Sequence, residues 1–130
     1  MINFRMMLAA VLAALLLSAC ADTGETMGSV FQPSNKQLLS GIKSYDDGDY
    51  QTALMTLRNA QQMGLEDKRD QVIAHKYLAF IHCVSGREQQ CRDEFKKALT
   101  IDPAFELTPA EAGHPVWGPI FRGEKAKLAK

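Results

Sequence analysis

Apolar side chains recur every three or four positions through the middle of the chain, which is the spacing of one face of an α-helix. Two such runs flank the polar stretch 46–49: Leu38, Leu39, Ile42 and Tyr45, then Tyr50, Ala53, Leu54, Leu57 and Ala60. Because Asp46-Asp47-Gly48-Asp49 interrupts the spacing, the pattern predicts two helices joined by a tight turn. Ser34 and Gln37 have the spacing of a capping box, which predicts that the first helix begins at Ser34.

The same pattern recurs further along the chain. Tyr77, Leu78 and Ile81 precede a break at Ser85-Gly86-Arg87, and a helix with Cys91, Phe95, Ala98 and Leu99 follows before Asp102-Pro103. Five residue pairs lie 38 positions apart: Gly41 and Ala79, Gly48 and Gly86, Ala53 and Cys91, Leu57 and Phe95, Ala60 and Ala98. The sequence therefore predicts an all-α fold with two copies of one hairpin, 34–67 and 72–105, and a longer link near 64–70.

Residues 106–130 are predicted to cap the second hairpin, because a stack of hairpins leaves an apolar face uncovered at its end. Thr108 and Glu111 have capping-box spacing, with proline at the first helical position. Two prolines and two glycines within 113–119 argue against a regular helix there, so Ile120 and Phe121 are expected to lead into a Lys-rich tail.

This C-terminal segment has two interpretations. In the first, Val116, Trp117, Ile120 and Phe121 fold back onto the open face of the second hairpin. In the second, a loop around Trp117 is exposed and docks a partner, since tryptophan is enriched at binding hot spots. The candidate protein-binding residues are then His114, Trp117 and Phe121.

The N-terminus has the pattern of a secretory signal peptide. Arg5 supplies a positive charge, and the apolar run 6–17 that follows is 12 residues long. A membrane-spanning helix needs about 20 apolar residues, so this run is too short to be one. Residues 1–19 are therefore predicted to be removed, and residues 20–33, rich in Thr, Gly, Ser and Asp, to form a flexible tether.

The stretch Leu17-Ser18-Ala19-Cys20 resembles the lipobox of bacterial lipoprotein precursors. The resemblance implies that Cys20 receives a diacylglycerol, that a peptidase cuts before it, and that the new amino group is acylated with a fatty acid such as palmitate. Two or three acyl chains make a lasting membrane anchor. In that family an aspartate directly after the cysteine favours the inner membrane, and Ala21 here favours the outer one. The alternative is an ordinary signal peptide cut near Ala19 or Ala21.

Removing 19 of the 130 residues leaves 111, enough for one small domain. Arg5 is the only charged residue lost, so 14 basic and 15 acidic side chains remain. This near balance favours neither nucleic acid nor anionic lipid as a partner.

With Cys20 acylated, two of the three cysteines remain, Cys83 and Cys91. The periplasm is oxidising, which favours a disulfide between them. The alternative is two buried cysteines that stay reduced. A zinc site is disfavoured, because the seven-residue gap does not match the spacing of paired ligands and no further cysteine lies near His75 and His82.

No other pattern predicts catalysis, a cofactor or a metal. The stretch 46–49 lacks the alternating acidic spacing and the later glutamate of a calcium loop. His75 and His82 are seven apart and share a helix face, which favours a packed or groove-lining role, and His114 is expected to be a structural hydrogen bonder. No nucleophile, base and orienting group come together, so the sequence predicts a protein that is not an enzyme.

The two hairpins resemble tetratricopeptide repeats, which are 34 residues long. The shared features are small residues where the helices cross, a glycine in the turn, a large apolar residue in the second helix and a proline that ends it. The second copy matches better than the first, which lacks the proline and has Ser40 where a large apolar residue is usual.

The C-terminal half also resembles the TssQ family of lipoproteins associated with type VI secretion. The resemblance lies in 75–83, Cys91, Phe95, 102–105 and the segment 111–119 with its His-Pro and Trp residues. It implies an accessory envelope protein that is not an enzyme and that binds other envelope proteins, such as a secretion subunit. The alternative function is a peptidoglycan-associated lipoprotein that assists a cell-wall enzyme or carries a hidden hydrolytic site.

Overall fold

The computed structural model describes residues 32–130, and within them every regular element is a helix. The elements are α2 (Pro33–Asp46), α3 (Tyr50–Met63), α4 (Lys68–Val84), α5 (Glu88–Ile101), α6 (Pro109–Ala112) and α7 (Trp117–Leu128). The predicted all-α class is confirmed. The predicted signal peptide 1–19, the acylated Cys20 and the tether up to residue 31 lie outside the described residues.

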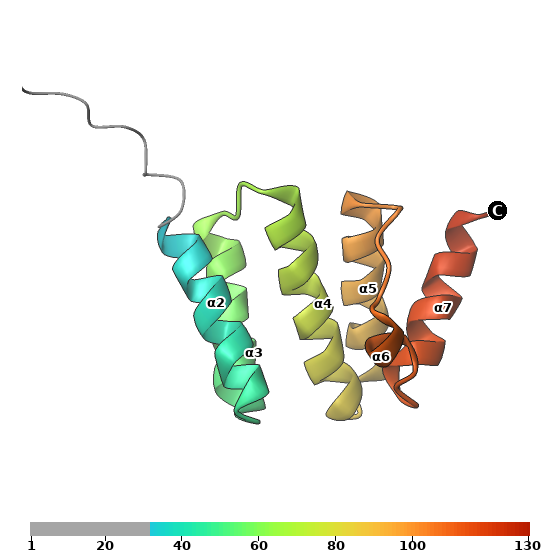
Figure 1. Ribbon diagram of the computed structural model, residues 1–130, viewed down its shortest axis with the longest axis horizontal. Coiled ribbons are helices and arrows are strands. Elements are labelled where there is room, and N and C mark those ends of the chain that lie inside the picture. Colours follow the sequence, from blue (N-terminus) through green and yellow to red (C-terminus); the bar gives the residue numbers. More distant parts are fainter. Residues whose placement is uncertain (1–31) are drawn as a thin grey trace, which may run out of the picture. The chain divides into compact units, whose positions relative to one another are not determined.

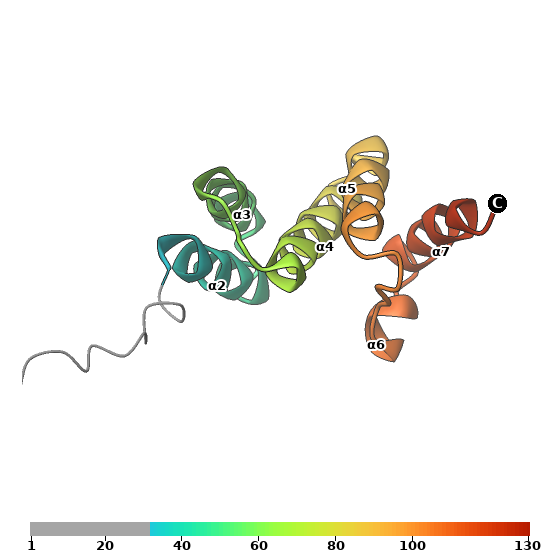
Figure 2. The ribbon, with the colours of Figure 1, turned by 90° about the horizontal axis from the view of Figure 1, so that it is seen from above.

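The described residues form two helical hairpins and a C-terminal cap. Helices α2 and α3 form the first hairpin, α4 and α5 form the second, and α7 packs against α5 and α4. Figure 2 shows α2, α4 and α6 along one side and α3 and α5 along the other. Residues 31–130 make one compact unit.

The 38-residue repeat places equivalent residues in equivalent surroundings. Gly48 and Gly86 both adopt a left-handed backbone, with φ of 81° and 72°, so each can close the tight turn of its hairpin. The small residues Ala53, Ala60, Ala79, Cys91 and Ala98 are all fully buried. At Gly41 an added Cβ would lie 2.7 Å from Cγ of Leu57, so this glycine lets α2 and α3 approach closely.

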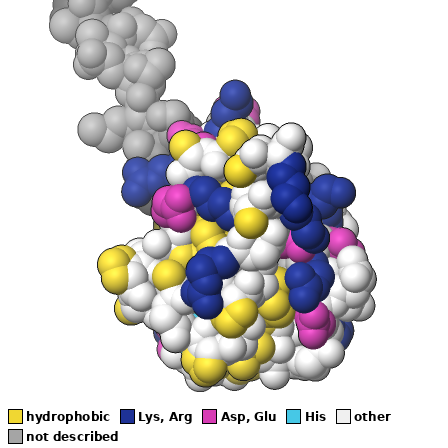
Figure 3. All heavy atoms as spheres, turned by 90° about the vertical axis from the view of Figure 1, so that its right-hand side faces the viewer, with side chains coloured by type: hydrophobic (Ala, Val, Ile, Leu, Met, Phe, Trp, Pro, Cys, Tyr) yellow, Lys and Arg dark blue, Asp and Glu magenta, His cyan; other side chains and the backbone are white. Residues whose placement is uncertain are grey.

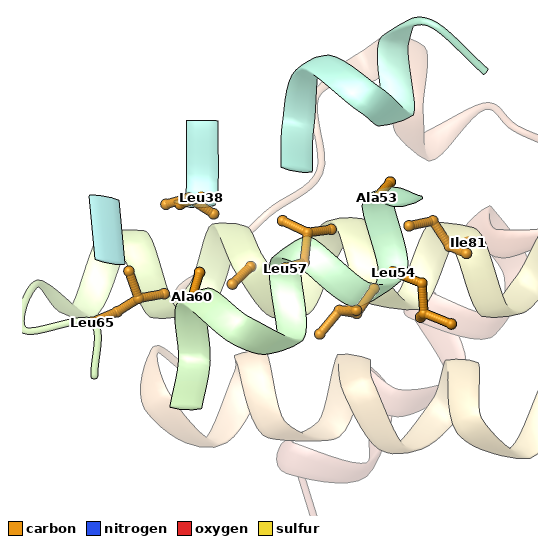
Figure 4. Close-up of a cluster of buried hydrophobic side chains, with 9 residues drawn as sticks. Leu38, Ala53, Leu54, Leu57, Ala60, Leu65 and Ile81 are labelled. Atoms are coloured by element: carbon orange, nitrogen blue, oxygen red, sulfur yellow. The ribbon is translucent and has the colours of Figure 1, made fainter. Parts of the chain in front are cut away.

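Helix α4 stands between two buried apolar clusters. The first cluster lies between the hairpins (Figure 4) and contains Leu38, Ala53, Leu54, Leu57, Ala60, Leu65, Ala74, Leu78 and Ile81. The second lies between the second hairpin and the cap and contains Ala79, Phe80, Cys83, Cys91, Phe95, Leu99, Leu107, Trp117 and Phe121. Because α4 supplies residues to both, it is apolar around most of its circumference, as expected of a central helix.

The start of α2 differs from the prediction. Gln32 is the N-cap, Pro33 is the first helical residue, and no side chain caps this end, so the predicted capping box at Ser34 is wrong. Proline is suited to this place because its fixed φ is helical and its missing N–H would have no partner there. Ser34 is instead buried against the hairpin. Residue 33, predicted to belong to the tether, is therefore helical.

The link between the hairpins also differs from the prediction. It comprises only 64–67, and α4 has 17 residues whereas α2, α3 and α5 have 14 each. The additional residues therefore lengthen the helix, not the loop. Asp67 explains the early start, because its side chain accepts a hydrogen bond from the backbone N–H of Arg69.

The C-terminal cap is more helical than predicted. The capping box of α6 is confirmed: the Thr108 side chain accepts from the Glu111 N–H, and the Glu111 side chain accepts from the Thr108 N–H. The expected irregular segment, however, ends at Val116, and α7 includes Gly118 and Pro119. Proline is tolerated because the first N–H groups of a helix have no partner within it. The predicted tail is helical as far as Leu128.

Candidate protein-binding surface

Trp117 and Phe121, two of the predicted contact residues, are buried in the cap. They are 8% and 3% exposed. The Trp117 ring stacks on Phe80 with ring centres 4.3 Å apart, and its indole N–H donates to the carbonyl of Glu111 at 2.8 Å. The expectation of an exposed Trp117 loop is therefore wrong, and the fold-back of these two residues is confirmed. The second hairpin provides apolar contact through Phe80, and α6 of the cap provides the acceptor for the indole N–H.

His114, the third predicted contact residue, supports the same corner. Its ring lies against the Trp117 ring with centres 3.3 Å apart, and its Nδ1 accepts the backbone N–H of Val116 at 3.2 Å. The expected role as a structural hydrogen bonder is confirmed. Val116 itself stays 44% exposed, so it does not fold back with its neighbours.

Cys83 and Cys91 lie at disulfide distance, with Cα atoms 5.1 Å apart. Cys83 is near the end of α4 and Cys91 is in the first turn of α5, so the pair bridges the two helices beside their turn. Both side chains belong to the second cluster. The predicted pairing is confirmed at the level of geometry.

The two histidines of α4 tie helices together. His75 Nδ1 lies 2.6 Å from Glu94 Oε2, and the Gln61 side chain lies 3.0 Å from the same nitrogen, so this group joins α3, α4 and α5. His82 is 3% exposed, and its Nδ1 accepts from Arg87 Nε at 2.8 Å. The expected packed role is confirmed for both. The sequence did not reveal Glu94 as the partner of His75, because the two are 19 positions apart on different helices.

The surroundings of His82 and Glu94 shift the pKa values of both side chains. Burial lowers the pKa of His82, and the nearby cations of Arg87 and Arg58 lower it further. Burial opposes the ionisation of Glu94, but hydrogen bonds from His75 and Lys97 outweigh it, so the pKa of this carboxyl is below its usual value. His82 is therefore held as a neutral acceptor, and Glu94 as an anion.

Apolar and aromatic side chains line one side of α2 and α4. We call this surface the α2–α4 face and define it by Leu39, Ile42, Tyr45, Ile73 and Tyr77. Leu39 is 67% exposed although its neighbour Leu38 is buried, so the prediction that both mark one buried face is wrong. Adjacent helical residues point about 100° apart, and only Leu38 is directed at α3 and α4. The other four are partly buried against the first cluster.

Two tyrosines form the centre of the α2–α4 face. The rings of Tyr45 and Tyr77 meet edge to face with centres 5.0 Å apart. Burial raises the pKa of Tyr45 to about 12 and also raises the pKa of Tyr77. Both phenols are therefore neutral at physiological pH and can donate or accept hydrogen bonds.

An ion pair joins this face to the cap. Lys76 Nζ lies 2.7 Å from Glu111 Oε1 and 4.8 Å from the centre of the Tyr77 ring. Burial opposes the ionisation of Glu111, but hydrogen bonds from Lys76 and Thr108 outweigh it and lower the pKa of the carboxyl. Lys76 thus connects α4 to α6 beside the aromatic pair.

A groove continues the α2–α4 face beyond Ile73. It has a volume of about 470 Å³, and its apolar wall comprises Val72, Ile73, Ile101 and Phe105. Lys68, Arg69 and Asp102 complete the lining. The surface therefore combines a long apolar strip with charged groups at one end.

Within residues 32–130, no three His, Cys, Asp or Glu side chains gather as metal ligands would. None of the helices in this range has the length and apolar character needed to span a membrane. Comparison of the chain with protein-family models, curated proteins and solved structures finds no match.

Proposed function

We propose that this protein is a lipid-anchored, non-catalytic scaffold of tetratricopeptide-like hairpins that binds another envelope protein through the α2–α4 face. We further propose that it is an accessory component of a type VI secretion system. The observation that carries the binding proposal is the apolar strip on α2 and α4, whose Leu39 is covered by no side chain of residues 32–130, in a fold whose other end is closed by α7.

The two ends of the hairpin stack differ in how their apolar residues are covered. At the C-terminal end, Trp117 and Phe121 fill the open side of the second hairpin. On α2, Leu39 is 67% exposed, and in the described residues no side chain covers it. Ile42, one turn further along the helix, is partly buried against the first cluster. The same face contains Tyr45 and Tyr77, and tyrosine is one of the residue types enriched at binding hot spots.

The partner that fits this face best is an amphipathic helix. The strip follows helices α2 and α4, which run side by side in the same direction (Figure 1), and a helix in a groove uses apolar anchors at intervals of three and four. Lys68 and Arg69 lie at the beginning of α4, whereas Asp46 and Asp47 lie at the end of α2. This charge difference would orient the partner, with its acidic end near Lys68 and Arg69.

Two observations support the proposed location. The stretch 17–20 resembles a lipobox, and the closeness of Cys83 and Cys91 suits a protein that folds in an oxidising compartment. With Ala21 after the cysteine, we propose that the anchor is in the outer membrane, with the hairpins facing the periplasm.

The type VI secretion proposal comes from the resemblance to the TssQ family. The residues that carry this resemblance occupy α4, the cysteine pair and the corner formed by His114 and Trp117. These are elements of the core and cap, so they support a shared architecture. The α2–α4 face also includes Leu39 and Tyr45, and these two residues lie outside the stretch that resembles the family.

Photo-crosslinking in cells tests the proposal. A crosslinking amino acid at position 39 is expected to capture a secretion subunit, and the same amino acid at position 55 is not. Met55 is a matched control because it is 58% exposed and lies on α3, on the other side of the hairpin. Leu39→Glu is expected to abolish capture from a neighbouring position such as Lys43, whereas Met55→Glu leaves it intact.

The outcomes separate the two candidate functions. A secretion subunit captured only from α2 supports the proposal. A cell-wall synthase or hydrolase captured there supports the peptidoglycan-associated alternative and overturns the secretion role. Equal capture from positions 39 and 55 would overturn the α2–α4 face as the docking surface.

A further inference from the structure

We propose that the end of the fold formed by α5 and α7 binds the surface of a membrane that contains anionic phospholipids. The surface in question, which we call the α5–α7 basic face, comprises Arg92, Lys96, Lys127 and the apolar Leu128. The inference goes beyond partner binding, and its physiological setting depends on the proposed lipid anchor. Its test needs neither the anchor nor a protein partner.

The α5–α7 basic face contains a groove between the two helices. The groove has a volume of about 420 Å³, and Arg92 and Lys96 of α5 line it together with Lys127 and Leu128 of α7. Leu99 contributes buried apolar surface to the same groove. Figure 3 shows Lys and Arg side chains next to apolar ones on this end of the molecule, with a smaller number of acidic side chains among them.

Two of the three cations of the groove, Arg92 and Lys127, are ion-paired. Arg92 Nη2 lies 2.6 Å from Oε1 of the exposed Glu88. Glu124 is only 6% exposed, and its Oε1 lies 2.7 Å from Lys127 Nζ and 3.4 Å from Arg92 Nη1. The buried Glu124 carboxylate therefore fixes the side chains of Lys127 and Arg92 at the edge of the groove. Asp93 also lines the groove and accepts a hydrogen bond from Gln89, whereas Lys96 is exposed and has no ion pair within residues 32–130.

The segment formed by α7 and the residues after it has more basic than acidic side chains. Residues 117–130 contain four basic side chains and a single acidic one, the buried Glu124. Lys125 is ion-paired with Glu106 and Lys127 with Glu124, so the excess positive charge of this end comes from the other basic side chains of 117–130 and from Lys96 of α5. Such a surface attracts anionic lipids, to which each nearby lysine or arginine adds roughly a fivefold gain in affinity.

The mixture of cations and apolar side chains favours a lipid surface over other polyanions. Leu128 is 51% exposed beside Lys127, so a shallow contact could place the leucine among acyl chains and the ammonium group at the phosphates. Twelve positions separate Cys20 from Gln32, a reach of at most about 40 Å when fully extended. An anchored chain can therefore bring this end of the fold to the bilayer.

Vesicle co-sedimentation tests the inference. Residues 31–130, which form a compact unit with both apolar clusters, are mixed with vesicles of phosphatidylcholine alone or with about one-third phosphatidylglycerol. Binding is expected only to the anionic vesicles, and it is expected to weaken as salt rises from about 50 to 500 mM, because salt screens exposed charges. The triple variant Lys96→Gln, Lys127→Gln, Lys130→Gln is expected to bind at least about tenfold more weakly.

A second triple variant provides the matched control. Lys36→Gln, Lys43→Gln, Arg58→Gln removes the same charge from exposed positions of the first hairpin and is expected to bind like the unaltered protein. Equal weakening by both triples, equal binding to neutral vesicles, or no binding to anionic vesicles would overturn the proposal. Tighter binding to duplex DNA than to anionic vesicles would overturn it in favour of a nucleic-acid surface.

A measurement on the intact processed protein keeps the inference testable if the shorter chain does not fold. In proteoliposomes, trypsin is expected to cut after Lys127 several-fold more slowly when phosphatidylglycerol is present, while cleavage after Lys36 keeps its rate. Equal rates after Lys127 in both lipid mixtures would contradict the proposal. Loss of partner capture with unchanged vesicle binding would affect only the proposed function.

Discussion

At the residue scale, two glycines of α7 illustrate how differently one residue type can be constrained. A Cβ at Gly118 would collide with the carbonyl oxygen of Ala112, a backbone atom held by α6. A Cβ at Gly123 would meet no atom within 4 Å. Gly118 therefore permits the close contact between α6 and α7, whereas Gly123 only lowers the helix propensity.

These two positions make a matched pair of alanine substitutions. Gly118→Ala is expected to lower the free energy of unfolding by about 1–3 kcal/mol, because the backbone around Ala112 must move. Gly123→Ala is expected to raise it by about 0.5–1 kcal/mol, because alanine is the better helix former. Urea unfolding followed by circular dichroism measures both, and equal effects of the two substitutions would contradict this account of the cap.

His82 determines a pH dependence near neutrality. Its pKa in the folded protein lies below the ordinary value of 6.5, chiefly because the ring is buried. Above pH 6.5 the ring is neutral in both states and contributes nothing. As the pH falls below 6.5, the unfolded chain binds a proton that the folded protein does not, so stability decreases.

We therefore expect the free energy of unfolding to fall between pH 7 and pH 5.5. His82→Gln, whose amide oxygen can still accept from Arg87, is expected to be less sensitive to pH over this interval. Glu94 and Glu111 act at lower pH, because their pKa values lie below the ordinary 4.5 and their contribution disappears only as they are protonated. Urea unfolding at a series of pH values measures this, and identical slopes for the two proteins would exclude His82 as the source.

At the scale of elements, the cysteine pair links α4 to α5 beside a turn that is already tight. The Gly86 turn and the buried contacts of Cys91 bring the two helix ends together, so the link constrains chiefly the unfolded chain. The stability of the helices depends on the apolar clusters on both sides of α4. The cysteine link adds stability to a hairpin that already has a core.

Removing the link is expected to lower stability without changing the fold. Cys83→Ala combined with Cys91→Ala is expected to lower the free energy of unfolding by about 2–3 kcal/mol, the value for a closed loop of about nine residues. Reductant is expected to lower the stability of the unaltered protein by a similar amount and to leave the double variant unchanged. If urea unfolding of the unaltered protein did not respond to reductant, and mass mapping of protein isolated from cells without reductant found both thiols free, the link would not exist in the cell.

At the scale of the whole molecule, the described unit has two surfaces of different chemistry. The α2–α4 face is apolar and aromatic, and the α5–α7 basic face is cationic around a small apolar area. The first is suited to a helix of a partner protein, and the second to the headgroups of a bilayer. Under the two proposals, this unit would bind a partner protein and the membrane at the same time.

The sequence by itself determined the existence of the four hairpin helices, their turns and the repeat, but not α7. Spacings of three and four, Gly48 and Gly86 in the turns, and the small residues 38 positions apart are local or periodic signals, and hydrogen bonds between near neighbours are enough to realise them. The pairing of Cys83 with Cys91 belongs to the same category, because only a short turn separates the two residues.

The tertiary structure alone decided which side chains are available at the surface. Trp117 is buried because its ring stacks on Phe80 and its indole N–H donates to the Glu111 carbonyl. Leu39 is exposed because α3 and α4 cover only the other side of α2. The Lys-rich C-terminal segment is visible in the sequence, but only the tertiary structure places Lys127 beside Arg92 and Lys96 of α5. Burial and electrostatic potential depend on neighbours far away in the chain, and no local pattern specifies those neighbours.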